Sequence, residues 1–298
     1  MFNLKRNIKE KFWKWIFFFL AFISVTILAL ISLFLFLEAF PIFKSVGFFE
    51  FLFGKFWYPT YDPPAFGILP MIVASISVTI LSSIFAIPFG LLTAIYISEV
   101  AQKRIKEIIK PIIELSASIP SVVIGFFGMV VVAPWLQAKF DIPTGLNIFN
   151  ASLMLAVMAI PTICSISEDA LNAVPFEYRE ASFALGSTKW ETIWHVIVPA
   201  ALPGITIASI LGIGRVMGET MVVLMVTGGA AMIPHSIFDP ARPLPASIAA
   251  EMGEAPFRSL HYHALFGCGL VLFFMTLFFN ILAEFIRNRF RTKGAGTL

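Results

Sequence analysis

Two charged residues, Arg215 and Glu219, lie within an apolar run that spans residues 202–227. A charged side chain in such a run is costly and usually faces a cavity or a partner. The guanidinium group suits a tetrahedral oxyanion, because its planar fork donates two parallel hydrogen bonds. Two interpretations stay open. The residues could form an i,i+4 ion pair inside a helix bundle, or Arg215 could receive a passing anion while Glu219 holds or releases the guanidinium.

Small residues precede this charged pair at helical spacing. In a helix, Gly204, Ala208 and Gly212 fall on the same stripe as Arg215 and Glu219, and the stripe is about 80° wide. Such a stripe permits either tight packing against another helix or a polar path.

A second group of titratable residues comprises His261 and His263, with Glu251 and Glu254 nearby. Two histidines at i,i+2 in a loop are more often interfacial side chains than metal ligands, so no metal site is predicted. The two carboxylates are expected on a short external helix, residues 244–255. A membrane-embedded enzyme remains an alternative, but no nucleophile and base occur at a persuasive spacing, and no catalytic residue is predicted.

The composition indicates the class of protein to which these residues belong. Of the 298 residues, 58% are hydrophobic and only 13% are charged, whereas soluble domains carry about 25% charged residues. The net charge of +3 gives no indication of nucleic-acid binding. The sequence therefore predicts an all-α integral membrane protein. Six apolar runs can form membrane-spanning helices, at residues 15–37, 69–98, 112–135, 149–166, 202–227 and 264–286.

The first run is too long for a signal peptide and is expected to remain as a membrane anchor. Orientation follows from the loops: 15 of the 21 Lys and Arg residues would lie on one face, five on the other, and Arg215 inside a span. Positive loops face the cytoplasm. Both termini are thus expected in the cytoplasm of a multi-pass plasma (inner) membrane protein surrounded by lipid.

The loop at residues 167–200 falls on the predicted cytoplasmic face. Ser165 to Glu168 and Thr188 to Glu191 both have capping-box spacing, and Gly186 between them is suited to a left-handed helix end. We expect two helices joined at Gly186, the second running toward Pro199. Small residues on the first helix favour docking of another protein over a connector lying on the membrane surface; they are Ala181, Ser182 and Ala184.

The same loop resembles the EAA signature of ABC-importer permeases, EAA-x3-G-x9-I-x-L-P. The matching positions are Glu180, Ala181, Ser182, Gly186 and Pro199, with Ser in place of the second Ala and Val in place of the Ile and the Leu. In that family the loop is the coupling helix, which sits in a groove of the cytoplasmic ATPase. The resemblance implies the type I ABC importer permease fold with six transmembrane helices, and it assigns these five residues to ATPase coupling.

The segment around the charged pair, Gly214 to Val223, resembles the PstC family of phosphate-specific ABC permeases, as do residues 238–242 and 248–254. The companion PstA family usually has Gly-Glu-Thr-Ala-Pro-Leu after the Arg, which this chain lacks. The likeness covers roughly residues 65–285. It implies a phosphate pathway that includes Arg215, Glu219 and Thr220.

That resemblance also implies partners: a second permease subunit (PstA-like), an ATP-binding subunit dimer (PstB-like) and an extracytoplasmic phosphate-binding protein (PstS-like). This chain has no P-loop motif, so it is expected to bind no cofactor, and ATP belongs to the partner. The expected division is an N-terminal tail, first span and external loop (1–67), a transmembrane domain (68–286) and a cytoplasmic tail (287–298). Another oxyanion, such as sulfate or molybdate, and an ATP-independent anion carrier remain alternatives.

Overall fold

The computed structural model describes residues 2–294, and within them the side chains of residues 11–282, 284 and 285. Residues 295–298 of the predicted C-terminal tail lie outside the described residues. The described chain is almost entirely helical, and a short antiparallel hairpin pairs β1 (Trp57–Tyr58) with β2 (Ala65–Phe66). The all-α prediction is confirmed.

Six helical segments are long and apolar enough to cross a membrane, as predicted. The first lies within α1 (Phe2–Ser45), and the second joins α3 (Leu69–Ile95) to the π-helical turn η1 (Tyr96–Val100). The fourth is α7 (Ile148–Asn172), and the sixth lies within α13 (Leu260–Gly294). The third and fifth spans differ from the prediction.

The third span begins later than predicted. Residues 112–117 belong to α4 (Lys103–Ala117), a separate helix with charged residues along one side. The chain then turns at Ser118–Pro120, since the residue before a proline is disfavoured in a helix. The span itself consists of α5 (Ser121–Phe127), η2 (Gly128–Val132) and α6 (Ala133–Phe140).

The fifth span begins earlier and ends earlier than predicted. Three elements form one helical segment from Lys189 to Met217: α9 (Lys189–Thr192), η3 (Ile193–Ile197) and α10 (Val198–Met217). Pro199 therefore does not end the helix. A wider π-helical turn precedes it, as η2 precedes Pro134, and such a turn accommodates a proline that cannot donate a backbone hydrogen bond. After Gly218 the chain breaks and restarts as α11 (Met221–Val226).

Helix α7 is the centre of the bundle, since 15 of its 25 residues are buried, whereas among the described side chains of α1 only Ala39 and Ile42 are. Ile163 of α7 fits between two glycines: a Cβ on Gly90 of α3 or on Gly212 of α10 would come within 3 Å of its side chain. Because glycine has no side chain at either position, α3, α7 and α10 can pack closely.

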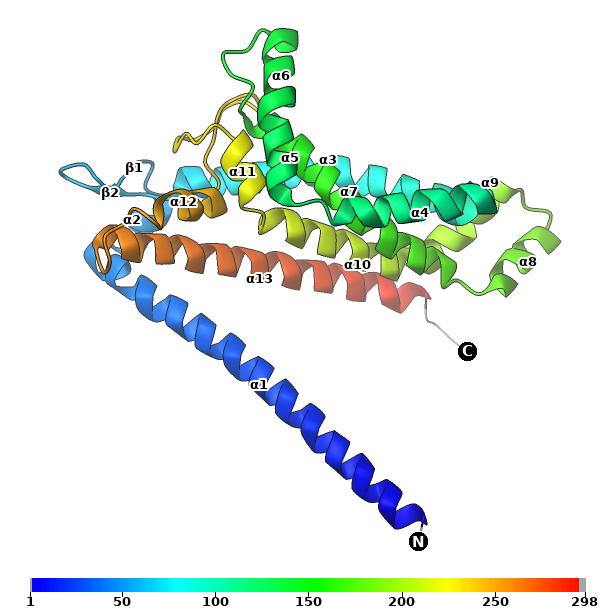
Figure 1. Cartoon of the computed structure of the whole chain (residues 1–298). Coiled ribbons are helices and arrows are strands. Elements are labelled where there is room, and N and C mark those ends of the chain that lie inside the picture. Colours follow the sequence, from blue (N-terminus) through cyan, green and yellow to red (C-terminus); the bar gives the residue numbers. More distant parts are fainter. Residues whose placement is uncertain (1, 295–298) are drawn as a thin grey trace.

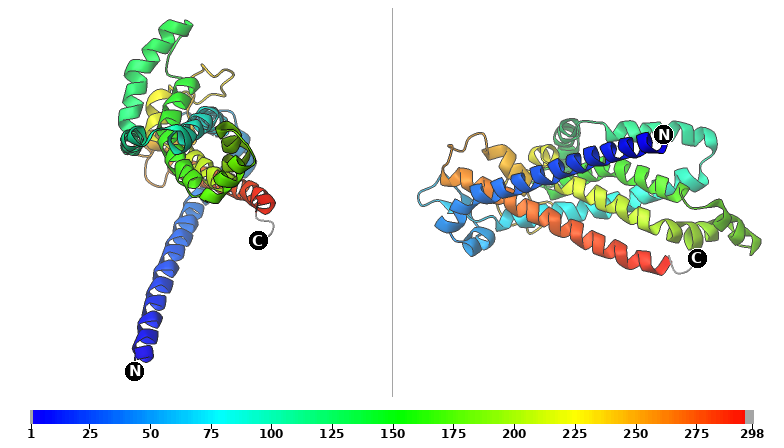
Figure 2. Two further views of the ribbon diagram at one scale, coloured as in Figure 1. Left: turned by 90° about the vertical axis from the view of Figure 1, so that its right-hand side faces the viewer. Right: turned by 90° about the horizontal axis from the view of Figure 1, so that it is seen from below.

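Helix α1 leaves the bundle, while the long helices α3, α7, α10 and α13 run side by side (Figure 1). A second view shows α1 projecting as a single helix (Figure 2). At one end of the bundle lie α2 (Phe48–Phe53), the hairpin and α12 (Leu244–Glu251); we call this the α12 end. The opposite end carries α8 (Phe176–Ala184) and α9 and is called the α8 end.

Candidate functional site

Arg215 lies near the end of α10, half-buried, and reaches two other elements. Its Nη1 donates a hydrogen bond to Oγ1 of Thr162 on α7 at 2.9 Å, and its Nη2 donates to the carbonyl oxygen of Ala117 on α4 at 3.3 Å. Both acceptors are neutral, and no carboxylate among the described side chains forms an ion pair with Arg215. The guanidinium therefore keeps N–H donors and a full positive charge available to an anion.

Of the two interpretations of Arg215 and Glu219, the i,i+4 ion pair is not formed in the structure. Helix α10 ends at Met217, so Glu219 does not continue the helical stripe that brings i and i+4 together. The Glu219 carboxylate instead accepts hydrogen bonds from the backbone N–H groups of Met221 at 3.1 Å and Val222 at 3.4 Å. It thereby satisfies backbone donors at the start of α11.

The small residues of the stripe pack against α7. A Cβ on Gly204 would lie 2.4 Å from the Cβ of Ala170, and one on Gly212 would lie 2.5 Å from Cγ1 of Ile163. Of the two interpretations of the stripe, tight helix packing is the one that the contacts support.

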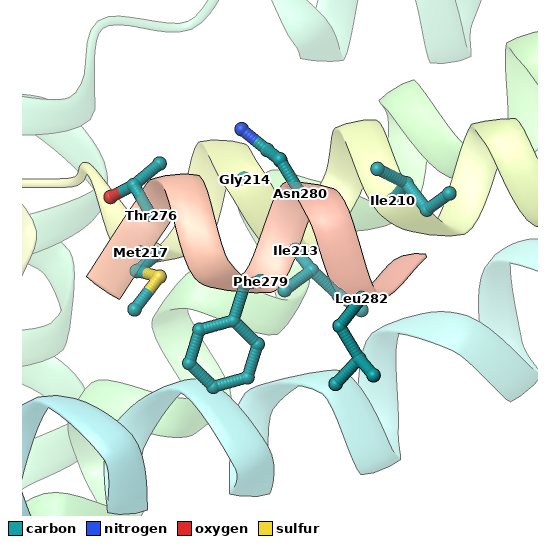
Figure 3. A pocket seen from close by; sticks show the side chains of 8 residues that line it. All are labelled: Ile210, Ile213, Gly214, Met217, Thr276, Phe279, Asn280 and Leu282. Carbon is teal, nitrogen blue, oxygen red and sulfur yellow. The ribbon is translucent and has the colours of Figure 1, made fainter. Parts of the chain in front are cut away.

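A pocket of about 120 Å³ lies on the other side of α10, against α13 (Figure 3). Its lining is mostly apolar, and Arg215 is not part of it. The pocket is lined by Ile210, Ile213, Gly214, Met217, Thr276, Phe279, Asn280 and Leu282. It lacks the charged donors that recognition of an oxyanion requires.

The first half of the predicted loop is already helical. Ser165 to Glu168 form no capping box, because α7 continues through them to Asn172. Helix α8 begins only after Pro175, at Phe176. The interior of an apolar helix thus overrides a local capping pattern.

The second half of the loop agrees with the prediction. Gly186 has a positive φ of 84° and follows the end of α8. Thr188 begins α9 with a complete capping box: its backbone N–H donates to Oε2 of Glu191 at 2.7 Å, and its Oγ1 accepts from the Glu191 N–H at 3.4 Å. The two helices therefore meet at a defined turn.

Ser182, one of the predicted docking residues, is buried inside this turn. Its hydroxyl lies 2.9 Å from Oγ1 of Thr192 on α9, so a Ser at this position ties α8 to α9. Glu180, Ala181, Gly186 and Pro199 are exposed. The small-residue surface is thus smaller than predicted, because one of its members faces inward.

Replacement of Thr188 with Ala should lower the free energy of unfolding by about 1 kcal/mol, the usual cost of losing an N-terminal cap. Thermal unfolding of the purified protein in detergent measures this, with Thr188→Ser as the control that keeps the hydroxyl. If the Ala and Ser variants unfold at the same temperature, the cap makes no contribution.

Large apolar side chains, which the sequence reasoning missed, are exposed on α8, on α9 and on the turns beside them. Leu185 is 88% exposed and Trp190 is 58% exposed. We call this set the loop face; it comprises Phe176, Tyr178, Phe183, Leu185, Trp190 and Trp194. The detectable signal was the density of aromatic residues in a segment that also carries charges. Apolar side chains gathered on a protruding loop mark an interaction site.

At the α12 end, Glu251 joins three segments that are distant in sequence. Its carboxylate accepts hydrogen bonds from Nε1 of Trp57 at 3.0 and 3.2 Å, pairs with Arg242, and lies 2.8 Å from Nε2 of His261. Trp57 is buried against this carboxylate. Helix α12 begins at Leu244 as predicted but ends at Glu251.

The second histidine also has a partner, since Nδ1 of His263 lies 2.8 Å from the carbonyl oxygen of Glu38. Among the described residues, no group of three or more His, Cys, Asp and Glu could hold a metal ion. The histidines thus connect α13 to α12 and to α1.

A bundle of six spans around α7, with an apolar loop face at one end, is the architecture of a multi-pass membrane protein. A family model described as "Binding-protein-dependent transport system inner membrane component" matches residues 86–293. The chain belongs to this family, and it is a multi-pass inner membrane protein. The permease subunits of ABC transporters are not themselves enzymes, in agreement with the prediction.

Curated relatives extend the likeness over most of the chain. A "Probable ABC transporter permease protein YqgH" of Bacillus subtilis is 41% identical over 80% of this chain and 78% of that protein. The phosphate transport system permease protein PstC of Pasteurella multocida is 32% identical over 84% of this chain and 83% of that protein. PstC of Mesorhizobium japonicum is 30% identical and covers 90% of this chain and 87% of its own.

Solved structures support the fold alone. The bacterial alginate ABC transporter, in complex with its pentasaccharide-bound periplasmic protein, has a chain with a TM-score of 0.61 at 16% identity, covering 92% of this chain and 96% of that one. An inward-facing MetNI methionine ABC transporter gives 0.59 at 20% identity, covering 75% and 95%. The predicted type I ABC importer permease fold is confirmed.

Proposed function

We propose that this chain is a permease subunit of an ATP-driven importer of inorganic phosphate. Two relatives named as phosphate transport permeases align with 84% and 90% of this chain. The observation that carries the proposal is Arg215, a guanidinium that is held in a span by two neutral acceptors. A half-buried cation beside an apolar span, without a carboxylate partner, is costly unless an anion is to meet it.

Phosphate fits this position by charge and shape. The guanidinium fork can donate two parallel hydrogen bonds to two phosphate oxygens. Glu219 and Thr220 follow directly at the break between α10 and α11, and we include both in the pathway. Glu219 fixes the start of α11 and thereby the position of the break beside Arg215.

The loop face and the exposed Glu180, Ala181, Gly186 and Pro199 form the surface that couples the permease to a separate ATPase. Ser182 belongs to the same element as an internal tie. ATP binds and is hydrolysed on that partner (PstB-like), and this chain holds no cofactor. When the ATPase dimer closes, it pushes the α8–α9 turn and changes the side to which the pathway is open.

The complete importer would contain a second permease subunit (PstA-like) and an extracytoplasmic phosphate-binding protein (PstS-like). The α8 end faces the cytoplasm in this assembly, together with both termini, in accordance with the distribution of Lys and Arg. The α12 end then faces the binding protein. Residues 68–286 form the transmembrane domain, preceded by the first span and its loop (1–67) and followed by the tail (287–298).

Uptake of labelled phosphate should depend on this chain and on ATP. Cells with and without the chain are compared for uptake of labelled phosphate, sulfate and molybdate, and the assay is repeated with the ATPase inactivated in its P-loop. Phosphate uptake is expected to fall in both cases, with sulfate and molybdate unchanged. Loss of sulfate or molybdate uptake instead would assign the other oxyanion, and uptake that persists without ATP hydrolysis would indicate a carrier.

A further inference from the structure

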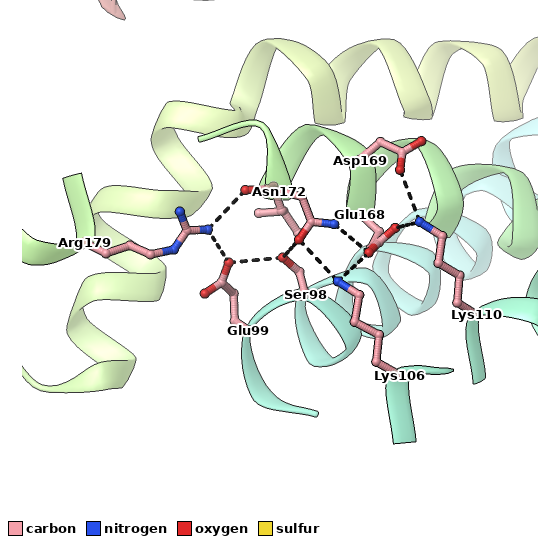
Figure 4. Close-up of polar contacts among 9 residues, drawn as sticks. Ser98, Glu99, Lys106, Lys110, Glu168, Asp169, Asn172 and Arg179 are labelled. Atoms are coloured by element: carbon pink, nitrogen blue, oxygen red, sulfur yellow. Dashed lines mark hydrogen bonds and ion pairs between the residues drawn. The ribbon is translucent and has the colours of Figure 1, made fainter. Parts of the chain in front are cut away.

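A network of polar residues at the α8 end connects η1, α4, α7 and α8 (Figure 4). It involves residues to which the proposed function assigns no role. Most of its members are charged, and they come from parts of the chain that are far apart in sequence. The network leads from α8 inward to Glu168 on α7 and from there to α4.

The first link fastens α8 to η1, the π-helical turn that follows α3, and to the end of α7. Nη2 of Arg179 donates to Oε1 of Glu99 at 2.7 Å, and the two side chains are only 15% and 10% exposed. The same guanidinium also donates to the backbone carbonyl oxygens of Val174 at 2.7 Å and Leu171 at 3.2 Å. Movement of α8 must therefore move Glu99 or break a charge-assisted hydrogen bond.

The second link leads from Glu99 to Glu168. The hydroxyl oxygen of Ser98 lies 3.1 Å from Oε1 of Glu99 and 3.1 Å from Oδ1 of Asn172. The Asn172 amide in turn donates to Oε1 of Glu168 at 2.6 Å. The Ser98 hydroxyl has a single proton and can donate it to only one of its two acceptors at a time. The unbroken connection from the loop to α7 is therefore the hydrogen bond from Arg179 to the Leu171 carbonyl oxygen.

Glu168 then fastens α7 to α4. Its carboxylate is 2% exposed and pairs with Nζ of Lys106 at 2.8 Å and Nζ of Lys110 at 2.5 Å. A buried carboxylate held by two ammonium groups resists separation, because loss of one partner would leave an uncompensated charge. The hydrogen bond to Glu168 raises the pKa of Lys110, so Lys110 stays charged at neutral pH, and strongly alkaline conditions would weaken this link by neutralising the ammonium group.

Helix α4 carries the link onward to Arg215. None of the residues of α4 is fully buried, so packing alone holds this helix weakly. Seven residues beyond Lys110, the carbonyl oxygen of Ala117 accepts the hydrogen bond from Arg215. Seven residues of helix span about 10 Å. One short helix thus touches the network at one end and the proposed anion site at the other.

We infer that Glu168 and Arg179 are positioning residues that transmit movement of the α8–α9 turn through α4 to Arg215. The inference rests on the proposed function, because Arg215 must be the group that meets the anion. When α8 is displaced, Glu99 and the end of α7 follow, Glu168 carries α4 with it, and the Ala117 carbonyl shifts against the guanidinium. The position of the Arg215 guanidinium thereby depends on the state of the ATPase.

The alternative role of the network is to stabilise the α8 end without transmitting anything. The number of phosphate ions imported per ATP hydrolysed separates the two roles. A purely structural loss lowers assembly, thermal stability and both rates together, whereas a broken transmission leaves ATP hydrolysis and lowers import. The measurement uses the full complex in proteoliposomes, with both permeases, the ATPase and the loaded phosphate-binding protein.

Glu168→Gln and Arg179→Gln each break one link. We expect both complexes to assemble and hydrolyse ATP, while phosphate imported per ATP falls about tenfold, as for a coupling free energy in the usual range. Glu107→Gln and Arg104→Gln are matched controls, because they make the same chemical changes at exposed positions of α4. Both controls should keep the wild-type ratio.

If Glu168→Gln does not assemble, Lys110→Gln replaces it, since Lys106 still holds Glu168 in that variant and a smaller fall in the same ratio is expected. An unchanged ratio in the assembled variants would overturn the inference while the wild-type complex still imports phosphate. A wild-type complex that hydrolyses ATP but imports no phosphate would instead refute the proposed function. The two failures are therefore distinguishable.

Discussion

Replacing Arg215 with Gln should reduce phosphate uptake by about tenfold to a hundredfold, which is the loss expected when one or two hydrogen bonds to a charged group disappear. Gln can still donate to Thr162 or to the Ala117 carbonyl, so the contacts among α4, α7 and α10 are partly kept. The positive charge is lost entirely. The complex should therefore assemble, and uptake of labelled phosphate in cells measures the defect.

Two further variants show whether the charge or the shape of the Arg215 side chain is responsible for the expected uptake defect. Arg215→Lys keeps the charge but loses the planar fork, so uptake should lie between those of the wild type and the Gln variant. Arg104→Gln makes the same change at an exposed position and should have no effect. Normal uptake by an assembled Arg215→Gln complex would leave Arg215 with a structural role only.

The number of spans could be predicted from the sequence because each span is a continuous apolar run in a chain with few charges. The limits of the third span could not, because residues 112–117 are apolar enough to extend it although they belong to α4. Averaged hydropathy does not register the turn at Ser118–Pro120. Nor does it show that α4 is attached mainly by polar contacts to α7 and α10.

Local capping patterns predicted one helix start correctly and one wrongly. Thr188 and Glu191 have the same spacing as Ser165 and Glu168, yet only the first pair forms a capping box. The difference is tertiary, since Glu168 is buried on α7 and is bound by Lys106 and Lys110. A carboxylate with two such partners is not available to cap its own helix.

The contacts of Arg215 could not be predicted either. Arg215 could be identified as a candidate anion-binding residue because it is a charged residue in an apolar run, and this depends only on the local composition. An ion pair with Glu219 would require the helix to continue through residue 219, but α10 ends at Met217. Thr162 and the carbonyl oxygen of Ala117 are distant in sequence, and no spacing rule connects them to Arg215.

The second large effect is expected at the turn between α8 and α9. Gly186 has a φ of 84°, and no atom lies within 4 Å of the place that a Cβ would occupy, so a larger side chain would meet no clash but would be strained by its backbone conformation. That strain is about 1–2 kcal/mol for an L-residue, and it is greater for a β-branched one. In the Gly186→Val variant, residue 186 should therefore leave the left-handed conformation, and Leu185 should be displaced relative to Trp190.

Because both side chains belong to the loop face, the displaced turn should lose the ATPase. We expect co-purification of the ATPase with Gly186→Val to fall about tenfold or more, which corresponds to the loss of about 1.4 kcal/mol of binding free energy. Gly186→Asn should retain the partner, since Asn adopts left-handed conformations readily. Gly253→Val is the matched control, because Gly253 also has open space around it but no positive φ. If the Val variant at position 186 keeps its ATPase, the geometry of this turn does not determine docking, and the loop face must bind in some other arrangement.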